Sequence, residues 1–321
     1  MSGTYRAPRW LAGAHAQTIY PALRTPPAVR FRRERVDTPD GDFVDFDWLD
    51  AATPAADTPT VVLFHGLEGG SASHYALALM RRLRTVGWRG VIPHFRGCSG
   101  EPNRLPRAYH SGDYAEIGWM LATVRARVPA APLYAVGVSL GGSALLNWIG
   151  RQERQALTTL AAAAAVSAPL DLTAAGIAIG QGFNRIYARH FLSTLVPKAL
   201  AMAQRFPGTL DAAAIRRARS MHAFDDVVTA PLHGFGGVCD YWQRASSKPW
   251  LGGVAVPTLV LNAKNDPFVP ASSLPATDAV SRAVRLEQPA HGGHAGFATS
   301  PFPGSLDWLP GRLLQFFARS Q

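Results

Sequence analysis

Tyr134-Ala-Val-Gly-Val-Ser-Leu-Gly-Gly142 is the stretch that decides the fold of this 321-residue chain. The apolar run 133–138 predicts a buried strand, and the run 143–149 after it predicts a buried helix. Ser139 stands between them, with glycines two residues before and two residues after it. A strand that turns directly into a helix strains the residue at the bend, and small neighbours allow the two segments to approach closely. This G-x-S-x-G pattern therefore predicts a serine hydroxyl held at the end of a sheet strand.

The flanking sequence predicts the sheet to which this strand belongs. Further apolar runs typical of buried strands cover 60–64, 90–95, 158–166, 256–263 and 284–288. Helical patterns alternate with them over 73–86, 111–128 (capped by Ser111 or Asp113), 274–283 and 306–318. This alternation predicts an α/β fold with a mostly parallel sheet and helices on both faces. Two more strands, 33–36 and a half-buried 43–49, precede it, and residues 1–27 are expected to be irregular.

The strand–helix rhythm stops between residues 172 and 248. Apolar residues there recur at helical spacings, and Pro197, Pro207 and Pro231 are expected to divide the segment. We interpret 172–248 as a helical lid inserted into a single domain that spans 1–321. An ordinary helical layer without a gating role is the alternative.

Composition describes an ordinary globular protein, with 47% hydrophobic and 17% charged residues. The formal net charge of +10 is unusual, and only three of the 32 basic residues are lysines. Attraction to nucleic acid or anionic lipid would explain such a charge, but no nucleic-acid motif accompanies it, and we favour a solvated, arginine-rich surface.

The two cysteines, Cys98 and Cys239, do not form a disulfide framework. The first twenty residues contain no apolar signal-peptide core, and no run of eighteen apolar residues predicts an integral membrane segment. The predicted location is the cytoplasm.

Three residue types needed for nucleophilic catalysis follow predicted strands in the order Ser139, Asp266, His294. A serine hydroxyl needs an imidazole base, and a carboxylate must hold that imidazole in the correct tautomer. Parallel strands end at a common edge of the sheet, where these side chains would meet. Asp171 is a rival acid that more simply caps a helix, and His291 is a rival base. His65 is expected to fix its own loop, and no cluster predicts a metal site.

A tetrahedral intermediate needs two N–H donors for its oxyanion. The backbone of Leu140, directly after the serine, is one candidate, and Leu67, in the glycine-rich loop after the 60–64 strand, is the other. No phosphate-binding glycine pattern is present, so no cofactor is expected. Tyr109, His110 and 240–247 either line the pocket or pack the lid onto the sheet.

These motifs resemble the YheT-like branch of the α/β-hydrolases, which is related to eukaryotic α/β-hydrolase-domain lipases and esterases. The matching stretches span nearly the whole chain: Ala14-His-Ala-Gln-Thr18, His65-Gly-Leu-Glu-Gly69, Phe95-Arg-Gly-Cys-Ser-Gly-Glu-Pro-Asn103, Tyr109-His-Ser-Gly112, Gly137-Val-Ser-Leu-Gly-Gly142, Asp240-Tyr-Trp-Gln-Arg-Ala-Ser-Ser247, Asn265-Asp-Pro-Phe268 and His291-Gly-Gly-His294. The resemblance implies an α/β-hydrolase fold and a serine hydrolase of carboxylic esters.

Together, residues and resemblance predict hydrolysis of short- to medium-chain acyl esters through an acyl-enzyme, with a small-molecule ester as the partner and no nucleic acid. A thioesterase, an acylglycerol lipase or an acyltransferase would use the same triad. A non-catalytic binding protein on a hydrolase scaffold is the alternative from another class.

Overall fold

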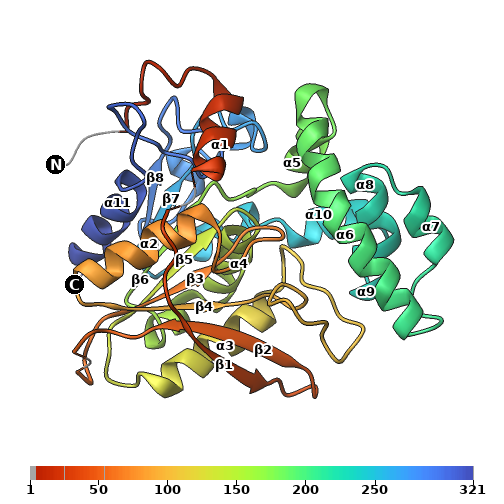
Figure 1. Ribbon diagram of the computed structural model, residues 1–321, viewed down its shortest axis with the longest axis horizontal. Helices are drawn as coiled ribbons and strands as arrows, with labels where there is room; N and C mark the ends of the chain where they lie inside the picture. The colour runs from red at the N-terminus through yellow and green to blue at the C-terminus, as the bar shows by residue number, and fades with distance from the viewer. Residues whose placement is uncertain (1–4, 25, 54, 321) are drawn as a thin grey trace.

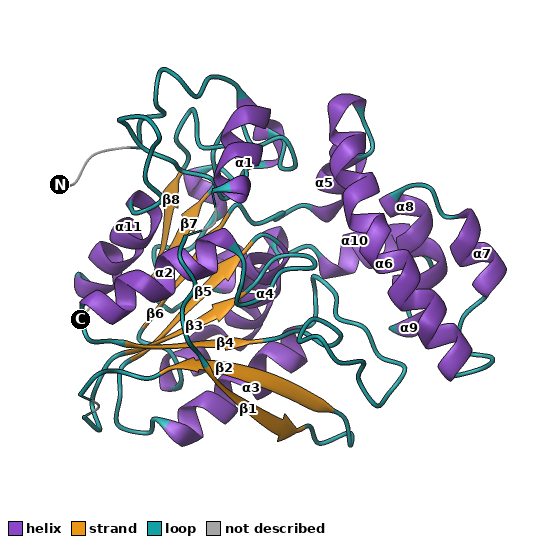
Figure 2. Ribbon diagram, in the orientation of Figure 1, coloured by secondary structure: helices purple, strands orange, loops and turns teal. Residues whose placement is uncertain are grey.

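The computed structural model describes residues 5–24, 26–53 and 55–320, and its described part contains an eight-stranded sheet between layers of helices (Figures 1 and 2). The strand order is β1-β2-β4-β3-β5-β6-β7-β8. β1 and β2 pair antiparallel, as do β2 and β4, and every other neighbouring pair is parallel. The predicted α/β fold with a mostly parallel sheet is confirmed.

The strands of this sheet are short. They are β1 (Arg32–Asp37), β2 (Phe43–Leu49), β3 (Thr60–Phe64), β4 (Arg89–Pro93), β5 (Leu133–Val138), β6 (Ala162–Val166), β7 (Thr258–Leu261) and β8 (Val284–Glu287). The helices of the two covering layers and the N-terminal region are α1 (Ala14–Leu23), α2 (His74–Thr85), α3 (Tyr114–Arg127), α4 (Leu140–Gln152) and α11 (Trp308–Ala318).

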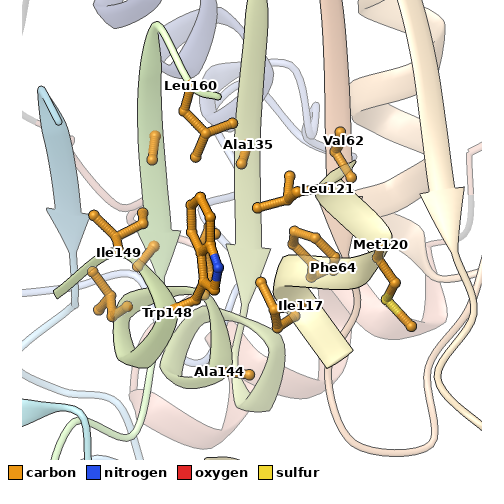
Figure 3. Packing of buried hydrophobic residues seen from close by; sticks show 14 of the residues in the cluster. Val62, Phe64, Ile117, Met120, Leu121, Ala135, Ala144, Trp148, Ile149 and Leu160 are labelled. Carbon is orange, nitrogen blue, oxygen red and sulfur yellow. The ribbon is translucent and has the colours of Figure 1, made fainter. Parts of the chain in front are cut away.

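The core has two layers because successive strand residues point to opposite faces. In β3, Val62 and Phe64 pack on the side of α3 and α4, whereas Val61 and Leu63 pack on the side of α2 and α11. Figure 3 shows the first layer, where Trp148 of α4 lies among aliphatic side chains from the sheet and from α3. Burial on both faces explains why the central strands are apolar along their whole length.

Six α-helices lie between β6 and β7. They are α5 (Leu172–Ile179), α6 (Arg185–Arg205), α7 (Ala212–Arg217), α8 (Met221–Phe224), α9 (Ala230–Leu232) and α10 (Val238–Ala245), and a π-helical turn, η3 (Asp225–Thr229), joins α8 to α9. They project to one side of the sheet in Figure 1. Asp171 accepts a hydrogen bond from the Ala174 N–H at 3.0 Å and caps α5, as predicted. Pro197 lies inside the 21-residue α6 and does not divide it.

Three other local predictions are wrong. Residues 14–23 form α1 rather than irregular chain. β2 is buried along its whole length rather than half-buried, because Arg33 and Arg35 of β1 pair with Asp47 and Asp45 and cover them. Residues 274–283 do not form the predicted helix: one short 3₁₀ turn, Thr277–Ala279, lies there, and another, Ala271–Ser273, precedes it.

Candidate active site

Ser139 sits at the junction of β5 and α4 in a strained backbone conformation, with φ 54° and ψ −124°. The flanking glycines are required by close approach. A Cβ atom on Gly141 would lie 2.5 Å from the carbonyl oxygens of Phe64 and His65, and one on Gly137 would lie 2.5 Å from the Gly141 carbonyl oxygen. Only glycine allows the start of α4 to pack this tightly against β5 and the end of β3. The G-x-S-x-G pattern around Ser139 therefore explains its strained backbone conformation.

Ser139, His294 and Asp266 meet at the carboxyl edge of the sheet. His294 Nε2 lies 2.9 Å from Ser139 Oγ, and His294 Nδ1 lies 2.8 Å from Asp266 Oδ2. Ser139 directly follows β5, Asp266 lies in the loop after β7, and His294 lies in the loop after β8. The structure thus brings together all three residues that the chain order suggested.

Hydrogen bonds around Asp266 fix the orientation of the histidine. Asp266 Oδ1 accepts the N–H groups of Phe268 and Val269, at 2.8 and 3.3 Å, which leaves Oδ2 for His294. The side chain of Asp266 is fully buried, whereas that of His294 is 12% exposed. With Nδ1–H donating to Asp266, Nε2 carries the lone pair and accepts the Ser139 hydroxyl. This is the tautomer that a general base requires.

The rival residues lie elsewhere. His291 is exposed, and Asp171 caps α5. His65 is completely buried: its Nδ1 donates to the Gly66 carbonyl at 2.8 Å and its Nε2 accepts the Phe95 N–H at 3.1 Å. Burial lowers the pKa of His65 to about 3, so the ring is neutral and fixes its loop.

A family model described as "alpha/beta hydrolase fold" matches residues 59–301. The chain belongs to this family. Among its relatives, "Putative esterase YheT" of Escherichia coli strain K12 is 37% identical over 95% of this chain and 90% of that protein. "Phospholipase ABHD3" of Mus musculus is 30% identical over 98% of this chain and 78% of that protein.

Solved structures support the same fold. The esterase Pf2001 of Pyrococcus furiosus superimposes with a TM-score of 0.56 at 14% identity, covering 92% of this chain and 98% of that one. The alpha/beta hydrolase domain-containing protein 10 from mouse gives a TM-score of 0.54 at 13% identity, and the alignment covers 90% of this chain and 100% of that one.

Leu67 and Leu140, the two predicted oxyanion donors, line the same cavity as Ser139. Leu140 is the first residue of α4, where helix N–H groups have no intrahelical acceptor. Leu67 follows Gly66, whose Cβ position would be 3.1 Å from the Cβ of Ser139. Among the described residues, neither N–H group donates a hydrogen bond, so both are free to bind a developing negative charge.

The N-terminal helix α1 holds the histidine loop, which the sequence did not predict. Thr18 Oγ1 accepts the His294 N–H at 3.0 Å. Gln17 Oε1 accepts the Gly292 N–H and an Asn265 side-chain N–H, both at 2.9 Å, and Asn265 Oδ1 accepts the Gly293 N–H at 3.1 Å. Gln17 therefore ties the loop of Asp266 to the loop of His294.

A cavity of about 670 Å³ opens onto Ser139 and His294. The side chains that line it from the helical segment are mostly apolar: Leu172, Ala175, Ile179, Phe191, Leu195 and Met202. Tyr109, Tyr241 and Trp242 also line it. His110 instead packs against His233, with ring centroids 4.3 Å apart. The Tyr109-His-Ser-Gly112 motif therefore contributes both to the packing of the helical segment and to the cavity.

Two further observations concern cofactors and membranes. Within the described ranges, no three His, Cys, Asp or Glu side chains are grouped so that they could hold a metal ion. In the same part of the chain, no helix combines the length and the apolarity needed to cross a bilayer.

Proposed function

We propose that the protein is a serine hydrolase of carboxylic esters with Ser139, His294 and Asp266 as its catalytic triad. The observation that carries this proposal is the continuous contact from Asp266 through His294 to Ser139, at 2.8 and 2.9 Å, at the mouth of an apolar cavity. The proposed residues act on an ester whose carbonyl carbon lies next to Ser139 Oγ.

In the first half-reaction, His294 Nε2 takes the hydroxyl proton while Ser139 Oγ attacks the ester carbonyl. The N–H groups of Leu67 and Leu140 bind the resulting oxyanion. His294 then gives the proton to the leaving alcohol, and an acyl-enzyme remains. In the second half-reaction, His294 activates water, which attacks the acyl group and releases the acid and free Ser139.

The apolar cavity supports an acyl substituent as the group that the substrate buries. Its volume of about 670 Å³ lies within the usual range for small-molecule sites, and the helical segment supplies much of its lining. We propose that residues 172–248 act as a lid within a single domain and that short- to medium-chain acyl groups bind beneath it. We also propose a cytoplasmic location, because Cys98 and Cys239 are both free thiols and disulfides are typical of oxidising compartments.

A lipase or phospholipase is the second candidate. The relatives named "Phospholipase ABHD3" and "Monoacylglycerol lipase", the latter 28% identical over 74% of this chain, favour it. A panel of p-nitrophenyl esters of increasing chain length, a monoacylglycerol, a phosphatidylcholine and an acyl thioester separates these substrates. Adding an alcohol acceptor tests acyl transfer in the same assay.

The decisive experiment replaces the proposed nucleophile. Ser139→Ala is expected to lower p-nitrophenyl butyrate turnover by at least about 10³-fold while the circular dichroism spectrum stays unchanged. A fluorophosphonate should label the wild-type protein stoichiometrically at Ser139 and leave the variant unlabelled. Ser193→Ala, an exposed serine of α6, serves as the matched control. Labelling elsewhere, or full turnover by Ser139→Ala, would reject the proposal.

A further inference from the structure

Glu68 directly follows Leu67 and has a left-handed backbone, with φ 56°. This region is unfavourable for a residue with a side chain, so surrounding contacts must hold Glu68 there. Leu67 and Glu68 share a peptide unit, so contacts that hold Glu68 in place also restrain the position of Leu67. The contacts of Glu68 therefore bear on the geometry of the proposed oxyanion hole.

Tyr109 makes the first of these contacts. Its hydroxyl accepts the Glu68 backbone N–H at 2.8 Å and donates to Glu68 Oε1 at 3.0 Å. The ring of Tyr109 is itself fixed, because it stacks on Phe95 with centroids 5.2 Å apart and planes 7° apart. One rigid side chain thus binds both the backbone and the carboxylate of Glu68.

Lys198 of α6 makes the second contact. Its Nζ lies 2.8 Å from Glu68 Oε2, and both residues line the same cavity as Ser139. The side chain of Glu68 is only 10% exposed, whereas that of Lys198 is 46% exposed. On the same helix, Arg205 donates to the Asn103 carbonyl at 2.5 Å. Cations of α6 thus reach two loops of the sheet, and Lys198 is the one that contacts the residue after Leu67.

The ion pair also matters for charge. A carboxylate next to the oxyanion donor opposes the negative charge that forms on the substrate, and an ammonium 2.8 Å away offsets it. Loss of Lys198 would leave the carboxylate uncompensated beside the oxyanion. Loss of both charges would remove the conflict.

We propose that the Lys198–Glu68 ion pair couples the seating of α6 to the oxyanion hole, because Lys198 neutralises the carboxylate that lies next to Leu67. This inference rests on the proposed function. It makes ester hydrolysis depend on where α6 lies: when Lys198 leaves Glu68, the transition state loses stabilisation although the triad stays in place.

Three variants test this coupling: Lys198→Met, Glu68→Gln and the double variant. Lys198→Met is expected to lower kcat for p-nitrophenyl butyrate about tenfold with KM changed less than about twofold, because the lost interaction acts on the transition state. A trifluoromethyl ketone, whose tetrahedral adduct places an oxyanion in the hole, should bind about tenfold more weakly. Glu68→Gln, which keeps an acceptor for Tyr109, should stay within about threefold of wild type, and the double variant should recover to the same level.

Arg189→Met is the matched control, because it removes a cation from an exposed position of the same helix. It should leave kcat and inhibitor affinity unchanged. Equal kcat in Lys198→Met and Arg189→Met, a loss confined to KM, or a double variant no better than Lys198→Met would overturn the coupling while fluorophosphonate labelling of Ser139 persists. Failure of the wild-type protein to be labelled would overturn the proposed function and this inference together.

Discussion

The loops of Asp266 and His294 are held by neutral hydrogen bonds to Gln17 and Thr18, whereas the loop of Leu67 is held by Tyr109 and, in addition, by an ion pair to the half-exposed Lys198. On the first side, Gln17 and Thr18 are 3% and 7% exposed and belong to α1, which packs directly on the histidine loop. On the second side, the partner comes from α6, a helix of the projecting segment.

This difference separates two tasks. Under the proposed function, proton transfer needs fixed distances, and hydrogen bonds to buried, neutral side chains supply them with little dependence on solvent. An oxyanion forms only when a substrate is present, and the proposed coupling links its stabilisation to the position of α6. If the comparison is correct, the two sides should respond differently to mutation, salt and pH.

The largest effect is expected from Gln17→Leu. The change leaves the buried Gly292 N–H and the part-buried Asn265 side-chain N–H without their acceptor, which should lower the free energy of unfolding by about 2–4 kcal/mol. Because both triad loops would shift, we expect kcat/KM to fall about 100-fold at a temperature where the variant is folded. Urea denaturation and steady-state kinetics measure the two quantities. Gln155→Leu, at an exposed position, is the control, and a folded Gln17→Leu with wild-type kcat would contradict the fixed-loop view.

A smaller effect is expected from Thr18→Val, which keeps the shape but removes the acceptor of the His294 N–H. We expect kcat to fall about tenfold, because a misplaced imidazole transfers the proton less efficiently. Thr18→Ser restores the hydroxyl and should remain within about twofold of wild type. If valine and serine behave alike, the hydroxyl does not position the histidine.

The sequence predicted the parts of the site that depend on local patterns. The run 133–138 matches β5 at both ends, and the order Ser139, Asp266, His294 placed all three residues at one sheet edge. Strand periodicity, close packing at glycines and the common direction of parallel strands are enough for this.

The missed parts depend on contacts between residues that are distant in the chain. Gln17 reaches Asn265 and Gly292, which lie 248 and 275 positions away, and α1 is stabilised by that packing rather than by its own sequence. Asp113 precedes α3 as expected but does not cap it, because its carboxylate pairs with Arg107. The burial of β2 likewise depends on partners in another strand. The Ala14-His-Ala-Gln-Thr18 motif pointed to this region only through the family resemblance.

Salt should separate the two sides of the site. The Debye length falls from about 10 Å at 0.1 M to about 3 Å at 1 M salt, so the half-exposed pair of Lys198 and Glu68 is screened. We expect wild-type kcat to fall about twofold between 0.1 and 1 M NaCl. The double variant Glu68→Gln/Lys198→Met should show no such fall, whereas Thr18→Val should show the wild-type dependence. An equal response of all three proteins would mean that the ion pair does not act on catalysis.

The smallest effect concerns the pH dependence of stability, and it arises in the helical segment. Asp225 lines the cavity and accepts hydrogen bonds from Thr229 Oγ1 and Trp242 Nε1, at 2.7 and 2.9 Å. Burial raises the pKa of Asp225 to about 6. The unfolded chain ionises near pH 3.9, so the folded state binds this proton more tightly. The contribution of Asp225 to the free energy of unfolding is therefore full below pH 4, falls between pH 4 and 6, and is lost above pH 6.

Asp225→Asn keeps an acceptor for Trp242 and removes the ionisation. We expect the variant to gain about 1–2 kcal/mol over wild type at pH 7, where wild-type Asp225 carries a buried charge, and to match it at pH 4. Thermal unfolding at several pH values measures this difference. Gln204→Ala, at an exposed position of the same helical segment, removes no ionisable group and should give a difference that does not change with pH. If the difference for Asp225→Asn did not change with pH, the pKa of Asp225 would not be raised by folding. The helical segment would then show no pH response, and pH would not distinguish it from the neutral hydrogen bonds that hold the His294 loop.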